Sequence, residues 1–111
     1  MTNSKQKGSR GERELSHKLT DLGYQCRRTV QYCGNTGDAS DVVGLDGIHI
    51  ECKRNEHLNV YDAMAQSKHD AKEGLLPTVM WRKNNCEWLV TMRLEDWIEI
   101  YREWECGQHD R

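Results

Sequence analysis

Residues 38–53 read DASDVVGLDGIHIECK, and this stretch decides how the middle of the chain folds. Its last six residues alternate Ile, Ile and Cys with His, Glu and Lys, which is the period of a half-buried strand. Glu51 and Lys53 therefore project from the same face. The Asp-Gly pair before them indicates a tight turn that folds the strand starting at Asp41 back beside them. The stretch thus brings two carboxylates and an ammonium group together.

The same residues also have a simpler interpretation. Exposed strand faces commonly carry His, Glu and Lys, and an Asp before a strand is often only a turn residue. His49 shares the face of Glu51, so it either supports that glutamate from behind the site or, as we expect, is a surface histidine. The rest of the chain must decide between the two interpretations.

Length and composition predict one soluble domain. The chain has 111 residues, enough for a single core, with 31% charged and 36% hydrophobic residues. No apolar run approaches the roughly 20 residues needed to cross a membrane. The N-terminal residues lack the apolar stretch of a secretory signal, so we expect a cytoplasmic protein.

The cysteines do not indicate zinc or a disulfide framework. No two of them have the C-x₂-C spacing of zinc ligands, and their number is odd. Disulfides are also rare in the cytoplasm. We expect most of them to be small buried hydrophobic residues. They are Cys26, Cys33, Cys52, Cys86 and Cys106.

The formal net charge of −2 conceals an asymmetry along the chain. Residues 1–28 hold seven Lys and Arg against three acids, whereas residues 55–111 hold seven against eleven. A basic N-terminal segment is suited to phosphates while an acidic half faces away. An ordinary mixed surface would give the same counts, so charge alone does not decide between a phosphate-binding segment and a mixed surface.

Hydrophobic periodicity predicts a single domain at 9–111 after a flexible basic arm at 1–8. The predicted order is α-β-β-β-α-β-β-α, a mixed central sheet flanked by helices in an α/β fold. The last helix, from Leu94, carries an aromatic stripe that we expect to be core or subunit interface. The predicted helices span 9–22 and 60–73, and the predicted strands 24–30, 41–45, 48–53, 78–82 and 87–92. Asn59 is expected to cap the N-terminus of the second helix.

The first helix adds a third carboxylate. At 100° per residue, Glu12 lies roughly 50° from the centre of the Leu stripe, and Glu14 lies about twice as far round. Glu14 is therefore expected to be a solvated acid paired with Lys18 at i, i+4. Glu12 is expected to point towards the sheet, where a carboxylate needs a metal ion or a basic partner.

With these residues assembled, the chain resembles the PD-(D/E)xK nuclease superfamily, and within it the small Holliday-junction resolvases of archaea and phages. The matching segments are KGSRGERELSHKLTDLGYQCRR at 7–28, SDVVGL at 40–45 and IHIECK at 48–53, followed by a helix containing Gln66. The resemblance implies a restriction-endonuclease-like fold. One departure is Ser40, where the motif name has proline.

The resemblance also implies roles, residue by residue. Glu12 corresponds to the helix-borne acid of the family, and Asp41 to the motif aspartate. Glu51 and Lys53 correspond to the E-x-K pair. Gln66 corresponds to the glutamine of the following helix, and Arg28 to the arginine that ends the first strand. The polar, glycine-rich loop at 31–40 is similar to a junction-binding loop.

Phosphodiester hydrolysis needs a nucleophilic water and neutralisation of charge in the transition state. Mg²⁺ held by Asp41, Glu51 and the main-chain carbonyl of Cys52 would supply both, and Mn²⁺ is expected to substitute. Glu12 is a candidate ligand of a second ion, or it orients a metal-bound water. Lys53 is either a charge stabiliser or a base.

Five further side chains are candidates for the chemistry or for DNA contact. Gln66 would orient water or phosphate, although a plain surface glutamine fits the sequence equally well. Arg28 is expected on the inner face of its strand, with Arg27 facing solvent. Lys5, Lys7 and Arg10 are candidate backbone contacts, and a solvated tail is the alternative.

The sequence therefore predicts a metal-dependent, structure-selective DNA endonuclease that resolves four-way junctions. Cutting two opposed strands with one site per chain implies a homodimer. One alternative is another PD-(D/E)xK nuclease, a nickase or a restriction-like enzyme. Another is a non-catalytic nucleic-acid-binding protein on the same fold.

Overall fold

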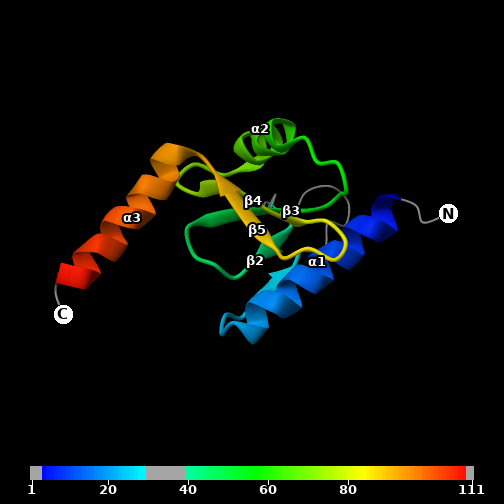
Figure 1. Ribbon diagram of the computed structural model, residues 1–111, viewed down its shortest axis with the longest axis horizontal. Helices are drawn as coiled ribbons and strands as arrows, with labels where there is room; N and C mark the ends of the chain where they lie inside the picture. The colour runs from blue at the N-terminus through cyan, green and yellow to red at the C-terminus, as the bar shows by residue number, and fades with distance from the viewer. Residues whose placement is uncertain (1–3, 30–39, 110–111) are drawn as a thin grey trace.

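The computed structural model describes residues 4–29 and 40–109, and its elements follow the predicted order (Figure 1). They are α1 (Ser4–Asp21), β1 (Arg27–Arg28), β2 (Val42–Val43), β3 (Ile48–Arg54), α2 (Val60–Asp70), β4 (Leu76–Arg82), β5 (Leu89–Met92) and α3 (Leu94–His109). None of the described helices is long and apolar enough to cross a membrane.

The five strands form one mixed sheet in the order β1-β2-β3-β4-β5. The β1–β2, β2–β3 and β4–β5 pairs are antiparallel, and β3 and β4 are parallel. Parallel neighbours need a crossover connection, which α2 provides. The turn between β2 and β3 is closed by Gly47 at φ 85°, and the amide of Ile48 donates to the Leu45 carbonyl at 3.1 Å. The predicted hairpin is therefore confirmed.

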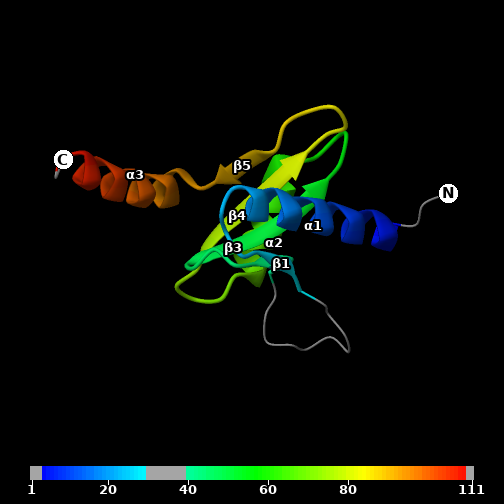
Figure 2. The same ribbon diagram turned by 90° about the horizontal axis from the view of Figure 1, so that it is seen from below.

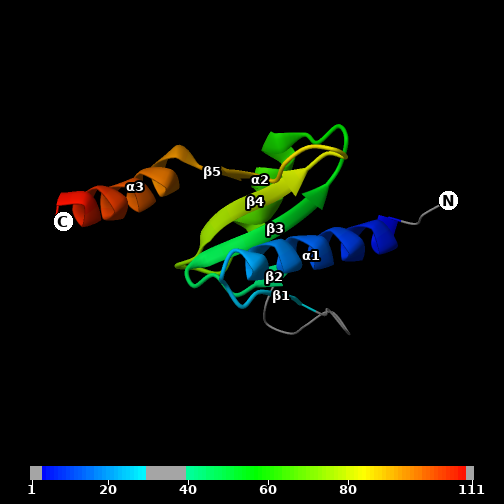
Figure 3. The same cartoon turned by 60° about the horizontal axis from the view of Figure 1, so that its bottom comes forward.

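The sheet lies between two helices. Figures 2 and 3 show α1 running across one face, and Figure 1 shows α2 on the other. The α1 side buries Leu15 against Val42, Ile50 and Met80. The α2 side buries Ala63, Met64 and Val79. Because both faces are covered, β3 and β4 are the buried centre of the sheet.

Several predicted boundaries differ from the structure. Helix α1 begins at Ser4, so most of the expected flexible arm is helical. The two glycines at positions 8 and 11 disfavour a helix and gave a late predicted start. Strands β1 and β2 have two residues each, and Gly44, at φ 132°, ends β2 after Val43. Residues 30–39 lie outside the described residues. The predicted Asn59 cap is confirmed: its side chain accepts the Asp62 amide at 3.1 Å.

The last helix, α3, projects away from the sheet (Figures 1 and 2). Its aromatic stripe is not core: Trp97, Tyr101 and Trp104 are 48%, 39% and 58% exposed. The expectation of mostly buried cysteines is also only partly met. Among the described cysteines, Cys86 and Cys106 are exposed, because they lie in a turn and on this projecting helix.

Candidate active site

The first carboxylate, Asp41, is fixed by the main chain of two neighbouring strands. Its amide donates to the Ile50 carbonyl at 2.9 Å, and its carbonyl accepts the Thr29 amide at 3.0 Å. Its side chain turns towards β3, where Oδ2 accepts the amide of Cys52 at 2.8 Å. The hairpin thus delivers the carboxylate to a defined point beside β3.

Asp41 lies against a second carboxylate, Glu51, which is 1% exposed. Burial first, and then the nearby charges of Glu51 and Glu12, raise the pKa of Asp41 from its usual 3.8 to about 7, against the lowering effect of the Cys52 amide. The Asp41 and Glu51 carboxyl groups also lie within hydrogen-bonding reach of each other. Two acids held this closely attract a proton or a cation between them.

Glu51 is held from behind by His49. The Nε2 atom of His49 lies 3.0 Å from Glu51 Oε1, and Nδ1 lies 2.8 Å from Ser40 Oγ. A neutral imidazole satisfies both contacts if the Ser40 hydroxyl donates to Nδ1 and Nε2–H donates to Glu51. The expectation of a surface histidine is wrong, because α2 covers this face and leaves His49 1% exposed.

These groups fit a hard divalent cation. Two carboxylates and a main-chain carbonyl are oxygen ligands, and Mg²⁺ retains several waters at such sites. Within one strand the N–H and C=O of a residue face the same edge, so the Cys52 carbonyl faces the Asp41 side. Burial and Asp41 raise the pKa of the Cys52 thiol far above its usual value, which leaves the carbonyl as its ligand group. Among the described residues, no three His, Cys, Asp or Glu side chains are arranged to hold a metal.

Lys53 follows on the same face and reaches α2. Its Nζ donates to Oε1 of Gln66 at 2.9 Å, in a contact exposed to solvent. The two residues are 13 positions apart in the chain. The strand that carries the E-x-K pair and the helix that carries the glutamine therefore meet in a direct side-chain contact.

Glu12 lies near these acids but has a basic partner. Its Oε2 is 3.2 Å from Arg28 Nε, and Arg28 Nη2 donates to Ser9 Oγ at 3.0 Å. Burial raises the pKa of Glu12, and the Arg28 hydrogen bond and charge oppose this. Glu12 therefore points towards the sheet as predicted. Arg28 is half-buried and Arg27 exposed, which confirms the predicted facing of that strand.

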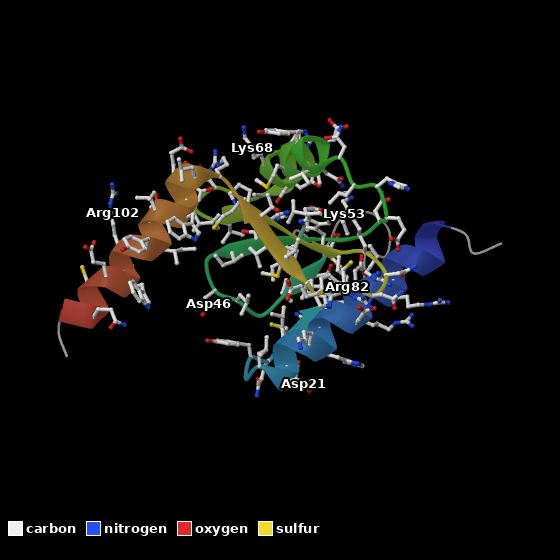
Figure 4. The ribbon with its side chains drawn as sticks, in the orientation of Figure 1. Asp21, Asp46, Lys53, Lys68, Arg82 and Arg102 are labelled. Carbon is white, nitrogen blue, oxygen red and sulfur yellow. The ribbon has the colours of Figure 1, made fainter. Side chains whose placement is uncertain are left out.

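Glu14 is not the solvated partner of Lys18 that helical spacing predicts. It forms ion pairs with Arg82 and with Arg54, where Nε lies 3.6 Å from Oε2. The two arginines come from β4 and β3, and Figure 4 shows Arg82 beside α1. Helical angles could not reveal them, because they lie far away in the sequence.

The close approach of α1 to β3 depends on Gly11. A Cβ atom added there would lie 2.6 Å from Arg54 Cγ and 3.8 Å from Cys52 Sγ. Gly11 is buried, and it immediately precedes Glu12. The absence of a side chain at this position therefore sets how near Glu12 comes to the other acids.

The candidate DNA contacts are less fully described. Lys5, Lys7 and Arg10 all lie on α1, and Arg10 is exposed. The 31–40 loop falls outside the described residues except for Ser40, which is buried. The Ser40–His49 contact and the two arginine partners of Glu14 were missed from sequence. The one available signal was a histidine two residues before the glutamate, on the same strand face.

Comparisons with known proteins concern the family and the fold of the chain. A family model described as phage putative PDDEXK endonuclease matches residues 3–108. Among solved structures, Archaeoglobus fulgidus Hjc, a Holliday junction resolvase from an archaeal hyperthermophile, is similar with a TM-score of 0.55. The two are 20% identical over 77% of this chain and 76% of that one, so the likeness concerns the fold. It confirms the predicted fold. No match was found among curated protein sequences.

Proposed function

Because the chain belongs to the phage putative PDDEXK endonuclease family, we propose that it is a metal-dependent DNA endonuclease that cuts branched DNA, above all four-way junctions, as a homodimer. One observation carries the proposal. The carboxyl pair of Asp41 and Glu51 stands beside Lys53. Acids that repel phosphate are thus grouped where a basic group can receive the phosphate. Binding DNA alone needs no such acids.

Asp41, Glu51 and the Cys52 carbonyl would hold the cation. When bound, it would neutralise charge at the scissile phosphate and lower the pKa of a water molecule. Asp41 must be ionised for this, so the cation replaces the proton that the carboxyl pair otherwise attracts. His49 keeps Oε1 of Glu51 engaged, which directs the other oxygen towards Asp41.

Lys53 supplies the positive charge that the phosphate meets. The 2.9 Å contact with Gln66 Oε1 holds the flexible ammonium at the open end of the site. A positioned ammonium stabilises negative charge that develops on the phosphate oxygens. Gln66 thus acts by orienting Lys53, and its own amide N–H₂ remains available to a phosphate oxygen.

Further basic side chains on α1 and β1 would meet the DNA backbone. Arg28 lies beside Glu12, so it can move from the carboxylate to a phosphate when DNA binds. In that state Glu12 becomes free to take part in cation binding or to orient water. Arg10 is an exposed backbone contact on the same helix, and Lys5 and Lys7 extend this basic segment.

Selection of branched DNA rests on the fold, and dimeric action rests on symmetry. The fold is similar to that of a Holliday junction resolvase. A junction must be cut on two opposed strands, and one chain offers one carboxyl pair, so two chains are needed.

The test is a panel of end-labelled DNAs of matched sequence: a four-way junction, a three-way junction, a flap, a linear duplex and a single strand. With Mg²⁺, we expect symmetric cuts across the junction and much slower cleavage of duplex. Equal cleavage rates on junction and duplex would contradict the proposed junction selectivity but would still support a nuclease. Cleavage of none of these DNAs would contradict the proposal.

A further inference from the structure

Helix α3 is an amphipathic helix whose apolar side lacks a partner in the described part of the chain. It makes no extensive contact with any other described helix or strand. The rings of Trp97 and Tyr101 stack at 5.3 Å, and those of Tyr101 and Trp104 follow at 5.6 Å. Figures 1 to 3 show the helix standing clear of the sheet from every side.

The position of α3 is unusual for a small domain. The radius of gyration is 14.7 Å, and a compact domain of this length is expected near about 13 Å. An isolated helix of this length is marginal in water, and most helical stability comes from packing of the apolar face. The aromatic stripe therefore needs a surface to cover it.

A matching surface lies next to the start of α3. An apolar groove of about 580 Å³ runs between α2 and β5. Tyr61 and Met64 line it from α2, Met92 from β5, and Leu94 from α3 itself. Tyr61 is 88% exposed. The groove and the stripe are thus one continuous apolar surface that meets at Leu94.

We infer that α3 of one copy docks in the α2–β5 groove of a second copy, in a two-fold arrangement with the axis near Leu94. A surface that carries both a projecting stripe and a groove is self-complementary, which is what a two-fold dimer requires. The inference deepens the homodimer of the proposed function, and rests on it for its purpose.

Charge and area both fit a second copy. Helix α3 carries five acids and one arginine, and one of these acids, Asp96, already pairs with Arg93 of the groove lining at 2.9 Å. Lys68 is the basic side chain with which the groove faces the remaining acids of a second copy. Figure 4 shows Lys68 on α2, far from Arg102 on α3. Docking would cover half of three aromatic rings and the groove opposite them, once in each copy. Together this removes on the order of 1,000 Å² of accessible surface from water. That is the size at which a specific interface begins.

The experiment is the mass of the full chain in solution, without DNA or metal, by sedimentation at about 10 μM. The wild type should weigh twice its 13.0 kDa. Tyr61→Glu in the groove and Trp97→Glu in the stripe should each give monomers, with a dissociation constant raised at least about a hundredfold. Tyr24→Glu, at an exposed tyrosine away from the groove, and Arg102→Glu, outside the stripe, should stay dimeric.

A mixture of the two variants identifies the pairing. Tyr61→Glu keeps an intact stripe and Trp97→Glu keeps an intact groove, so a mixed dimer has one complete docking site. Equal amounts mixed should form dimers at concentrations where neither variant does alone. Circular dichroism of each variant must match the wild type.

Three results would overturn the inference: a monomeric wild type, a dimer broken by Trp97→Glu but not by Tyr61→Glu, or a mixture that stays monomeric. None of them bears on cleavage itself. Nicking of single junction strands by Tyr61→Glu would separate a failed interface from a failed nuclease, because Tyr61 lies outside the carboxyl site.

Discussion

His49 Nε2 lies 3.0 Å from Glu51 Oε1, and both side chains are almost completely buried. The contact joins two residues on one face of β3, and Ser40, which lies just before β2, continues it. Buried carboxylates need such partners, because an unpaired one is costly. The orientation of Glu51 is therefore set by a residue that touches neither DNA nor the expected cation.

Replacing His49 should loosen Glu51. His49→Leu leaves two buried polar groups without this partner and should cost about 2–3 kcal/mol of unfolding free energy. The Mg²⁺ concentration for half-maximal cleavage should rise about 10- to 100-fold. His49→Gln should recover part of both losses. The matched control is His69→Leu, because His69 is exposed. An unchanged Mg²⁺ requirement in His49→Leu would show that the contact is only structural.

The raised pKa of Asp41 predicts a pH-dependent stability. Between 3.8 and about 7, the folded chain keeps a proton that the unfolded chain has released, so stability of the metal-free protein falls as pH rises through this window. The loss is at most about 4 kcal/mol. The Tm in EDTA should therefore be lower at pH 8 than at pH 5, and Mg²⁺ should restore it at pH 8.

Asp41→Asn should flatten that dependence, because it keeps an oxygen for the Cys52 amide and carries no charge. Asp46→Asn in the exposed β2–β3 turn is the control and should follow the wild type. The same slope of Tm against pH in Asp41→Asn and wild type would contradict the assignment.

Two glycines of α1 should respond in opposite directions. Gly11→Ala forces a Cβ against Arg54 and should cost about 1–3 kcal/mol, with reduced cleavage as Glu12 shifts. Gly8 has open space around it, so Gly8→Ala should gain up to about 1 kcal/mol from helix propensity. Chemical denaturation measures both. A Gly11→Ala variant as stable as Gly8→Ala would mean that α1 sits farther from β3.

Replacing Glu12 should reduce activity, whereas replacing Glu14 should reduce stability. Glu12→Gln should lose most cleavage, because the acid pairs with Arg28 and lies near enough to Asp41 and Glu51 to interact with their charges. Glu14→Gln should lower unfolding free energy by about 1 kcal/mol through its two arginines and leave the rate per folded molecule unchanged. Rates normalised to folded fraction give the comparison, and the reverse ranking would contradict it.

The order of helices and strands could be predicted because local patterns carry it. The alternation around Glu51, the turn before it and the Asn59 cap each depend on residues close together in sequence. The same locality explains the facing of Glu12, whose helical angle follows from its position alone.

The features that could not be predicted from the sequence depend on contacts between residues far apart in the chain. Glu14 has the angle of a solvated acid, but arginines from β3 and β4 reach it. His49 has the pattern of an exposed residue, but α2 crosses back over its face after β3. The projection of α3 could not be predicted either, because an aromatic stripe has the same sequence pattern whether it packs against the core or against another chain.

The most direct test of the account is cleavage of a labelled four-way junction by the wild type, Asp41→Asn and Glu51→Gln in Mg²⁺, with binding measured in Ca²⁺. We predict that the wild type cuts, that each variant is slower by at least about a thousandfold, and that all three bind the junction with similar affinity. Wild-type cleavage rates in both variants would contradict the carboxyl pair as the active site.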